Sequence, residues 1–151
     1  MTPNQPALLA FALALPLALC GCDKVAALTG LFEPSWEPVD TNGQDGAFHF
    51  VVNPYDMHVG LPEHVRVERT ERRTITKPGG AKEEQERQRQ VQVVLARCQP
   101  LSVCDAHPHS QDTREVVVTP AMMGEATLYV TVAVDGKEEM KDSIKLRVSP
   151  H

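Results

Sequence analysis

The chain lacks charge at its start and lacks the common catalytic motifs throughout. No Lys, Arg, Asp or Glu precedes Asp23. No Gly-x-Ser-x-Gly elbow, His-Glu-x-x-His pair or phosphate-binding Gly-rich loop occurs. Carboxylates are numerous, but no pair is set apart as an acid and base couple. These absences predict a protein that is not an enzyme and that uses no cofactor.

The chain also lacks an apolar run long enough to cross a bilayer as a helix. Its longest apolar segment, residues 7–19, is interrupted by Pro16 and has the size of a signal-peptide core. The alternative is a buried core helix, but no matching apolar helix is expected elsewhere to pack against it. We therefore expect a signal peptide.

This apolar segment runs directly into Leu19-Cys20-Gly21-Cys22, which resembles the lipobox of bacterial lipoproteins, Leu-x-Gly-Cys. The resemblance implies a signal peptide over residues 1–21 and a lipid on Cys22, the first residue of the mature chain. Lipid on Cys20 is the alternative, but Leu19 would then fill a position that normally takes Gly, Ala or Ser.

The resemblance implies an envelope protein that is held to a membrane and faces the periplasm. Asp23 directly follows the anchor, and in enterobacteria this residue retains lipoproteins in the inner membrane. The outer membrane is the alternative location. Trp36, the only Trp, is expected either at the lipid headgroups or against the edge of the domain.

Length, composition and charge indicate one ordinary globular domain. The 151 residues include 42% hydrophobic and 23% charged residues. The net charge of −5 argues against a nucleic-acid partner, which would require a clustered basic surface. Residues 22–46 have the Pro- and Gly-rich composition of a linker, which places the domain at residues 47–149.

Cleavage before Cys22 leaves Cys98 and Cys104 as an even pair, for which an oxidising compartment favours a disulfide. The alternative is a zinc or copper site that combines these two sulfurs with His107 and His109. Further ligands would join only if the fold gathers them: His58, His64, Met57, Met122 and Met123. For Met122 and Met123 we prefer a role in filling the core before Gly124.

Apolar residues alternate with polar ones from Ala47 onward, which predicts strands with one buried face. Phe48, Phe50 and Val52 form the first such run, and His49 between them should face outward. Residues 126–134 and 144–148, separated by the turn Asp135-Gly136, predict a C-terminal hairpin. Residues 113–119 predict a further strand that ends before Pro120.

Residues 81–90 contain strong helix formers, yet a helix there would have little apolar face. We prefer one long hairpin with its turn centred on Gly80. In this register Val65 faces Leu95, Val67 faces Val93, Glu71 faces Arg89 and Arg73 faces Arg87.

The tip of that hairpin is charged on both faces and should project into solvent. It is interpreted either as a mobile solvated hairpin or as an arm that docks on a protein partner. The candidate contact residues are Arg69, Glu71, Arg72, Arg73, Arg87 and Arg89.

Two segments resemble immunoglobulin-like modules of bacterial envelope proteins. Residues 53–68 look like their first crossing into strand B, and residues 124–132 resemble strand F, with Tyr129 near the tyrosine-corner position. The family's cysteine pair between the sheets is missing from these two strands. The resemblance implies an all-β, immunoglobulin-like sandwich of about seven strands, and it does not specify a function.

These expectations combine into a membrane-anchored lipoprotein with a non-catalytic binding or scaffolding domain. Its partners would be the lipid membrane, through Cys22, and an envelope protein. The alternative function is envelope metal binding through Cys98, Cys104, His107 and His109.

Overall fold

The computed structural model describes residues 33–54 and 56–150. The chain divides into two units, Met1–Ser35 and Trp36–His151, and the account below concerns the described part of the second unit. That part consists of strands, turns and loops, with no helix, so the predicted all-β class is confirmed. The predicted signal peptide and its lipobox lie outside the described residues.

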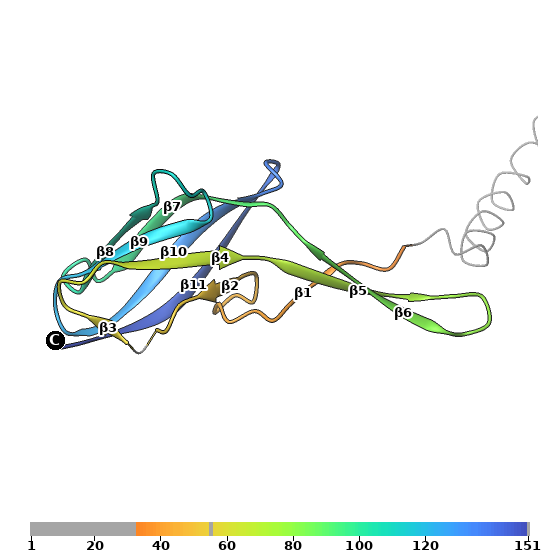
Figure 1. Cartoon of the computed structure of the whole chain (residues 1–151), viewed down its shortest axis with the longest axis horizontal. Helices are drawn as coiled ribbons and strands as arrows, with labels where there is room; N and C mark the ends of the chain where they lie inside the picture. The colour runs from red at the N-terminus through yellow and green to blue at the C-terminus, as the bar shows by residue number, and fades with distance from the viewer. Residues whose placement is uncertain (1–32, 55, 151) are drawn as a thin grey trace, which may run out of the picture. The chain divides into compact units, whose positions relative to one another are not determined.

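Two four-stranded sheets make up most of the domain (Figure 1). The first sheet has the order β2-β4-β9-β8 and contains His49–Val51, Glu63–Glu68, Glu115–Pro120 and Cys104–Pro108. The second has the order β3-β11-β10-β7 and contains Met57–His58, Glu138–Ser149, Gly124–Val134 and Val91–Gln99. Only β3 and β11 pair in parallel; the other pairs in these sheets are antiparallel.

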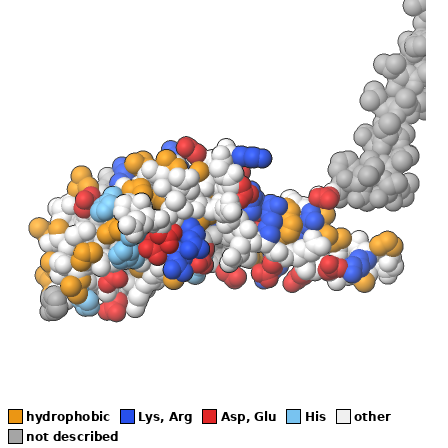
Figure 2. Space-filling model, turned by 45° about the horizontal axis from the view of Figure 1, so that its top comes forward, with side chains coloured by type: hydrophobic (Ala, Val, Ile, Leu, Met, Phe, Trp, Pro, Cys, Tyr) orange, Lys and Arg blue, Asp and Glu red, His pale blue; other side chains and the backbone are white. Residues whose placement is uncertain are grey.

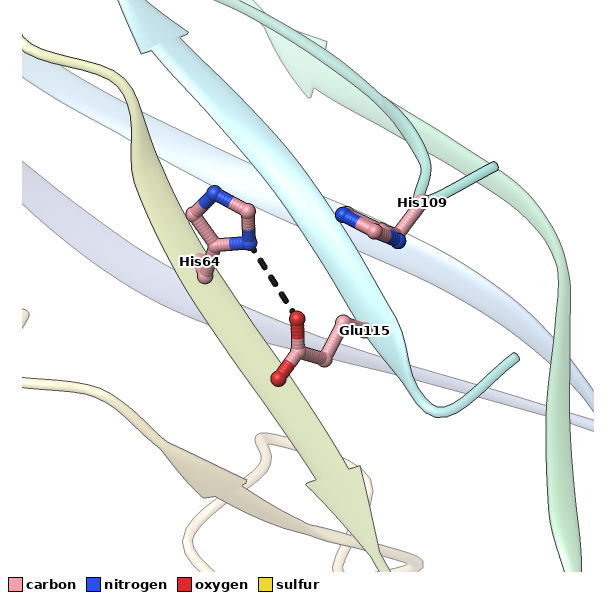
Figure 3. Close-up of side chains that lie close together, drawn as sticks. All are labelled: His64, His109 and Glu115. Carbon is pink, nitrogen blue, oxygen red and sulfur yellow. Dashed lines mark hydrogen bonds and ion pairs between the residues drawn. The ribbon is translucent and has the colours of Figure 1, made fainter. Parts of the chain in front are cut away.

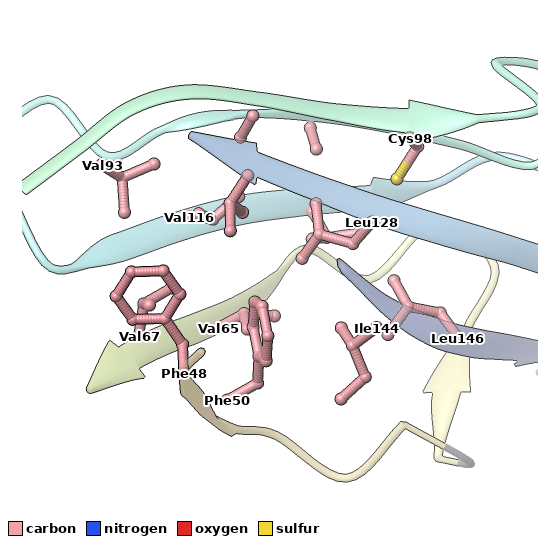
Figure 4. Packing of buried hydrophobic residues seen from close by; sticks show 14 of the residues in the cluster. Phe48, Phe50, Val65, Val67, Val93, Cys98, Val116, Leu128, Ile144 and Leu146 are labelled. Atoms are coloured by element: carbon pink, nitrogen blue, oxygen red, sulfur yellow. The ribbon is translucent and has the colours of Figure 1, made fainter. Parts of the chain in front are cut away.

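One hydrophobic core lies between the two sheets (Figure 4). Alternation along each strand directs every second side chain into it, so Phe48 and Phe50 are buried while His49 between them is not, as predicted. Other buried members come from both sheets: Val65, Val67, Val116, Val118, Leu128, Val130, Val132, Ile144 and Leu146. This burial is the main stabilising contribution to the domain.

The predicted C-terminal hairpin is confirmed by the pairing of β10 with β11 from Gly124↔Val148 to Val134↔Glu138. Its turn places Asp135 at φ 51° and Gly136 at φ 69°. Two successive positive φ values are those of a type I′ turn, which suits the twist of a tight hairpin and favours Asp-Gly. The turn residues therefore determined this register.

The predicted long hairpin forms only at its tip, in a different register, and its base is not paired as predicted. Val65 pairs with Val116 in one sheet, and Val93 pairs with Val132 in the other. Val65 and Val93 are both buried, whereas Leu95 is 55% exposed. The matching apolar residues of β4 and β7 suggested that these strands pair. They match because both strands face the same core, from opposite sheets.

Beyond that divergence, β5 (Thr70–Thr76) and β6 (Lys82–Gln88) form the tip, so residues 81–90 are a strand region and not a helix. The register differs from the predicted one: Glu71 opposes Arg87, and Arg73 opposes Gln85. The amide of Gly80 donates to the carbonyl of Lys77, and the turn is therefore one position earlier than predicted.

A short strand, β1 (Glu37–Val39), adds to β5 and completes a third sheet of order β1-β5-β6. We call these three strands the arm (Figure 1). The compact unit that contains the arm begins at Trp36.

The segment after β1 is held to the core by a buried carboxylate. Asp142 on β11 accepts hydrogen bonds from the amides of Asp45, Ala47, Phe48 and Ser143, at 2.8–2.9 Å. A Cβ on Gly43 would lie 2.1 Å from the carboxylate, so this position must be glycine for the loop to approach. The hydrogen bonds to Asp142 therefore fix the path of the chain between β1 and β2.

Candidate functional site

The predicted disulfide between Cys98 and Cys104 is present, with their Cα atoms 5.7 Å apart. It links the end of β7 to the start of β8 and therefore joins the two sheets across the core. Both cysteines are buried, at 2% and 0% exposure. The bridge involves neither β4 nor β10, the strands that the resemblance matches to those with the cysteine pair of immunoglobulin domains.

The predicted metal-ligand set of two cysteines and two histidines is not assembled in the structure. On β8, Cys104 and Ala106 face the core, while His107 faces outward, because successive side chains of a strand point to opposite faces. The two sulfurs are also bonded to each other and offer no thiolate. His107 and His109 therefore lie on the outer face, away from Cys98 and Cys104.

Four of the predicted contact residues form an internal ion-pair cluster: Arg69, Glu71, Arg87 and Arg89. Glu71 is 3% exposed and binds Arg69, Arg87 and Arg89 at 2.7–2.9 Å. Arg89 also pairs with Asp135 in the β10–β11 turn. Arg69 and Glu71 are thus buried structural residues, which corrects their assignment to a contact surface.

The charges around Glu71 determine its protonation. Burial alone would raise the pKa of this carboxyl group, but hydrogen bonds from Arg89, Arg87 and Arg69 outweigh burial and lower the pKa from 4.5 to about 2. The ion pair with Glu71 in turn raises the pKa of Arg89. The cluster is therefore charged at neutral pH and fixes the base of the arm to the sheets.

The remaining predicted contacts lie along the arm. The guanidinium groups of Arg73 and Arg87 lie 4.5 and 4.2 Å from the ring centroid of Trp36. Arg72 pairs with Glu86 at 3.3 Å, with side chains 38% and 51% exposed. Trp36 thus packs on the arm at the start of the compact unit, as one of its two predicted placements requires.

Two other predictions differ from the structure. Met122 and Met123 are each 56% exposed, because they lie in the turn before β10, outside the end of the core that Val103 closes. Tyr129 is 36% exposed and lies under the guanidinium of Arg97, so it does not occupy a buried tyrosine corner.

The outer face of the first sheet gathers three side chains that the sequence did not group. His64 on β4, Glu115 on β9 and His109 after β8 bring one potential ligand atom each to within 4.8 Å of one another (Figure 3). We call these residues the His64 cluster. The Nδ1 atom of His64 lies 3.2 Å from Oε2 of Glu115, and the two histidine rings have centroids 5.2 Å apart.

Sheet register explains this meeting. His64 is paired with Val117 and Arg66 with Glu115, so His64 and Glu115 are diagonal neighbours on one face. The amide of His109 donates to the carbonyl of Glu115, which places His109 on the other side of β9. Alternation along each strand indicates from the sequence which side chains face outward, but it does not indicate which strands pair.

Glu115 and His109 each have further partners outside the cluster. Glu115 accepts an ion pair from Arg66 at 3.5 Å, and its side chain is only 17% exposed. The Nδ1 atom of His109 accepts hydrogen bonds from the amides of Gln111 and Asp112, at 3.1 and 2.9 Å. In Figure 2, histidine side chains lie beside acidic and basic ones on the surface of the domain.

Two surface hollows have linings that include no member of this cluster. One, of about 350 Å³, is lined by Gln99, Glu125, Ala126, Thr127, Lys145, Leu146 and Arg147. The other, of about 540 Å³, is lined by Gln90, Val91, Gln92, Thr113, Arg114, Ala133, Asp135 and Gly136. Both hollows offer polar groups of either charge, which suits contacts with polar surfaces.

Within residues 33–54 and 56–150, no helix is long and apolar enough to cross a membrane. Comparisons of the chain with protein-family models, with curated proteins and with solved structures found no match.

Proposed function

We propose that the chain is a lipid-anchored lipoprotein of the bacterial envelope whose immunoglobulin-like domain uses the arm to bind another envelope protein. The anchor is argued from the lipobox ending in Cys22. The arm carries the binding part of the proposal, because it is the feature that the folding of the two sheets leaves unexplained.

The strand order supports the immunoglobulin-like assignment. Such domains have the sheets ABED and CFG. The order β2-β4-β9-β8 corresponds to ABED, and β11-β10-β7 corresponds to GFC, with β3 added beside β11. In this correspondence the arm hairpin β5–β6 is an extension of strands B and C. The missing cysteine pair of strands B and F is the main departure from the family.

The arm is held in place although it adds little apolar surface to bury. Strand β6 has the sequence Lys-Glu-Glu-Gln-Glu-Arg-Gln and is exposed or half-buried at every position. Ordering such strands costs conformational entropy that their own burial does not offset. The Glu71 ion pairs and the Trp36 contacts nevertheless fix both its base and its edge.

A hairpin with no task beyond solvation would not require two sets of anchoring contacts. A pre-ordered arm, in contrast, reduces the entropy that a partner must overcome on binding. Its exposed charges of both signs, Arg72, Arg87 and Glu86 among them, suit a polar protein surface. Arg69 and Glu71 are buried, and the Arg89 side chain is 19% exposed and paired with both Glu71 and Asp135. The proposed contact residues are therefore Arg72, Arg73 and Arg87.

The docking role is tested by shortening the arm. Thr74 pairs with Glu84, so residues 75–83 can be replaced by an Asn-Gly turn that keeps the register and the Glu71 cluster. We expect the shortened chain to fold and to lose envelope proteins that the native chain captures by cross-linking in cells. A matched control, Glu139→Gln, changes an exposed charge outside the arm. Equal capture by the native and shortened chains would contradict the proposal.

The anchor is tested separately. Cys22→Ala should leave an unprocessed or soluble product, whereas Cys20→Ala should still be processed and fractionate with membranes. Unchanged processing and membrane fractionation of Cys22→Ala would refute lipidation at this residue.

A further inference from the structure

We infer that the His64 cluster binds one divalent transition-metal ion, of which Zn²⁺ suits the ligands best. Two imidazole nitrogens and one carboxylate form a common three-ligand set for zinc, which leaves a position open. Imidazole ligands favour zinc and neighbouring transition metals over Mg²⁺ and Ca²⁺, which prefer oxygen. The inference is independent of the lipid anchor and of the arm.

The geometry is close to what zinc requires. With bonds of about 2.05 Å, two ligands of a tetrahedral zinc ion lie about 3.3 Å apart. His64 Nδ1 and Glu115 Oε2 are 3.2 Å apart, and all three ligand atoms fall within 4.8 Å. Rotation of the His64 side chain, which is 52% exposed, can supply part of the remaining contraction.

The surroundings position the carboxylate. Glu115 accepts an ion pair from Arg66, the residue with which it is paired in the sheet. A partner of this kind orients a metal-binding carboxylate. Because β4 and β9 are adjacent strands of a sheet whose inner face is buried, two of the three ligands stand on rigid elements.

Metal binding through the third ligand, His109, would change the turn that follows this residue. Because Nδ1 of His109 accepts two amide hydrogen bonds, the neutral ring carries its proton on Nε2. Coordination through Nε2 moves that proton to Nδ1, and the bonds from Gln111 and Asp112 must then break. Zinc binding is thus coupled to a rearrangement of residues 110–114, with no net proton lost from this ring.

The test titrates ZnCl₂ into the full chain by calorimetry, with Cys20→Ser and Cys22→Ser present in every sample so that these thiols bind no zinc. We expect one ion per chain. His64→Asn and Glu115→Gln should each weaken binding by more than about 100-fold, since the loss of an outer partner alone typically costs about 10- to 100-fold. His107→Asn, an exposed histidine on the same face, is the matched control and should bind as the parent does.

A second measurement reads the turn. Zinc should shift the NMR amide signals of Gln111 and Asp112 in the parent and not in His64→Asn. The inference would be overturned if the parent did not bind zinc, or if the His64 and Glu115 variants bound zinc as tightly as the parent. It would also be overturned if the parent bound Mg²⁺ as tightly as Zn²⁺. Circular dichroism verifies folding, and if Glu115→Gln fails to fold, the exposed His64→Asn variant decides.

Discussion

At the residue scale, Glu71 is the buried carboxylate with the most ion-pair partners among the described residues. Its pKa of about 2 lies below the ordinary value of 4.5, so the ionised form is favoured by folding. The stability this group adds is therefore fully present above pH 4.5 and is lost as the pH falls toward 2. The shift corresponds to about 3 kcal/mol.

Glu71→Gln should therefore lower the free energy of unfolding at pH 7 by about 3–5 kcal/mol, because Arg69 keeps a buried charge without its counter-ion. Urea unfolding between pH 7 and pH 2 measures both effects, and the variant should depend less on pH below 4.5. The matched control is Glu86→Gln, which breaks an exposed pair and should cost less than about 1 kcal/mol. Equal losses in the two variants would contradict the assigned role.

Asp142 supports the second residue-scale prediction. Asp142→Ala leaves buried amides of Ala47 and Phe48 without an acceptor, at about 1–3 kcal/mol for each unsatisfied group. We expect a loss of more than about 2 kcal/mol in urea unfolding. Gly43→Ala should also destabilise, because its Cβ would collide with the carboxylate. Lys141→Ala, exposed and adjacent, is the control; a comparable loss there would contradict this explanation.

At the element scale, the arm depends on contacts between strands that bury little apolar surface. Trp36→Ala removes the ring beneath Arg73 and Arg87, and cation–π contacts at exposed sites contribute about 0.5–1 kcal/mol each. Amides of β1 and β5 should then exchange hydrogen faster, while those of β10 and β11 keep their protection. Trp36→Phe should have a smaller effect. Unchanged exchange in Trp36→Ala would show that β1 is held by other contacts.

At the scale of the whole molecule, the Cys98–Cys104 disulfide joins the two sheets. The chain-entropy estimate for so short a ring is about 2 kcal/mol. The double variant Cys98→Ala/Cys104→Ala should lower the free energy of unfolding in urea by at least this amount, since both side chains also leave the core. Reducing agent should lower the urea midpoint of the native chain and not that of the double variant. A native midpoint that is unaffected by full reduction would contradict the prediction.

The sequence by itself determined the local features. Period-two alternation predicted the strands around Phe48 and in residues 126–148, and Asp135-Gly136 determined the tight turn between β10 and β11. These features depend on the nearest neighbours along the chain, where the pleat and the turn dihedrals are set. The disulfide followed from counting cysteines, and the lipid anchor remains a prediction from the lipobox.

Only the tertiary structure decided which sheet each strand joins. Val65 and Val93 are equally apolar, and alternation cannot distinguish a partner in the same sheet from one across the core. The same limit applies to His64 and Glu115, which are brought together by the pairing of β4 with β9. Pairing between distant strands depends on burying both faces of a shared core at once, and that condition is a property of the whole fold.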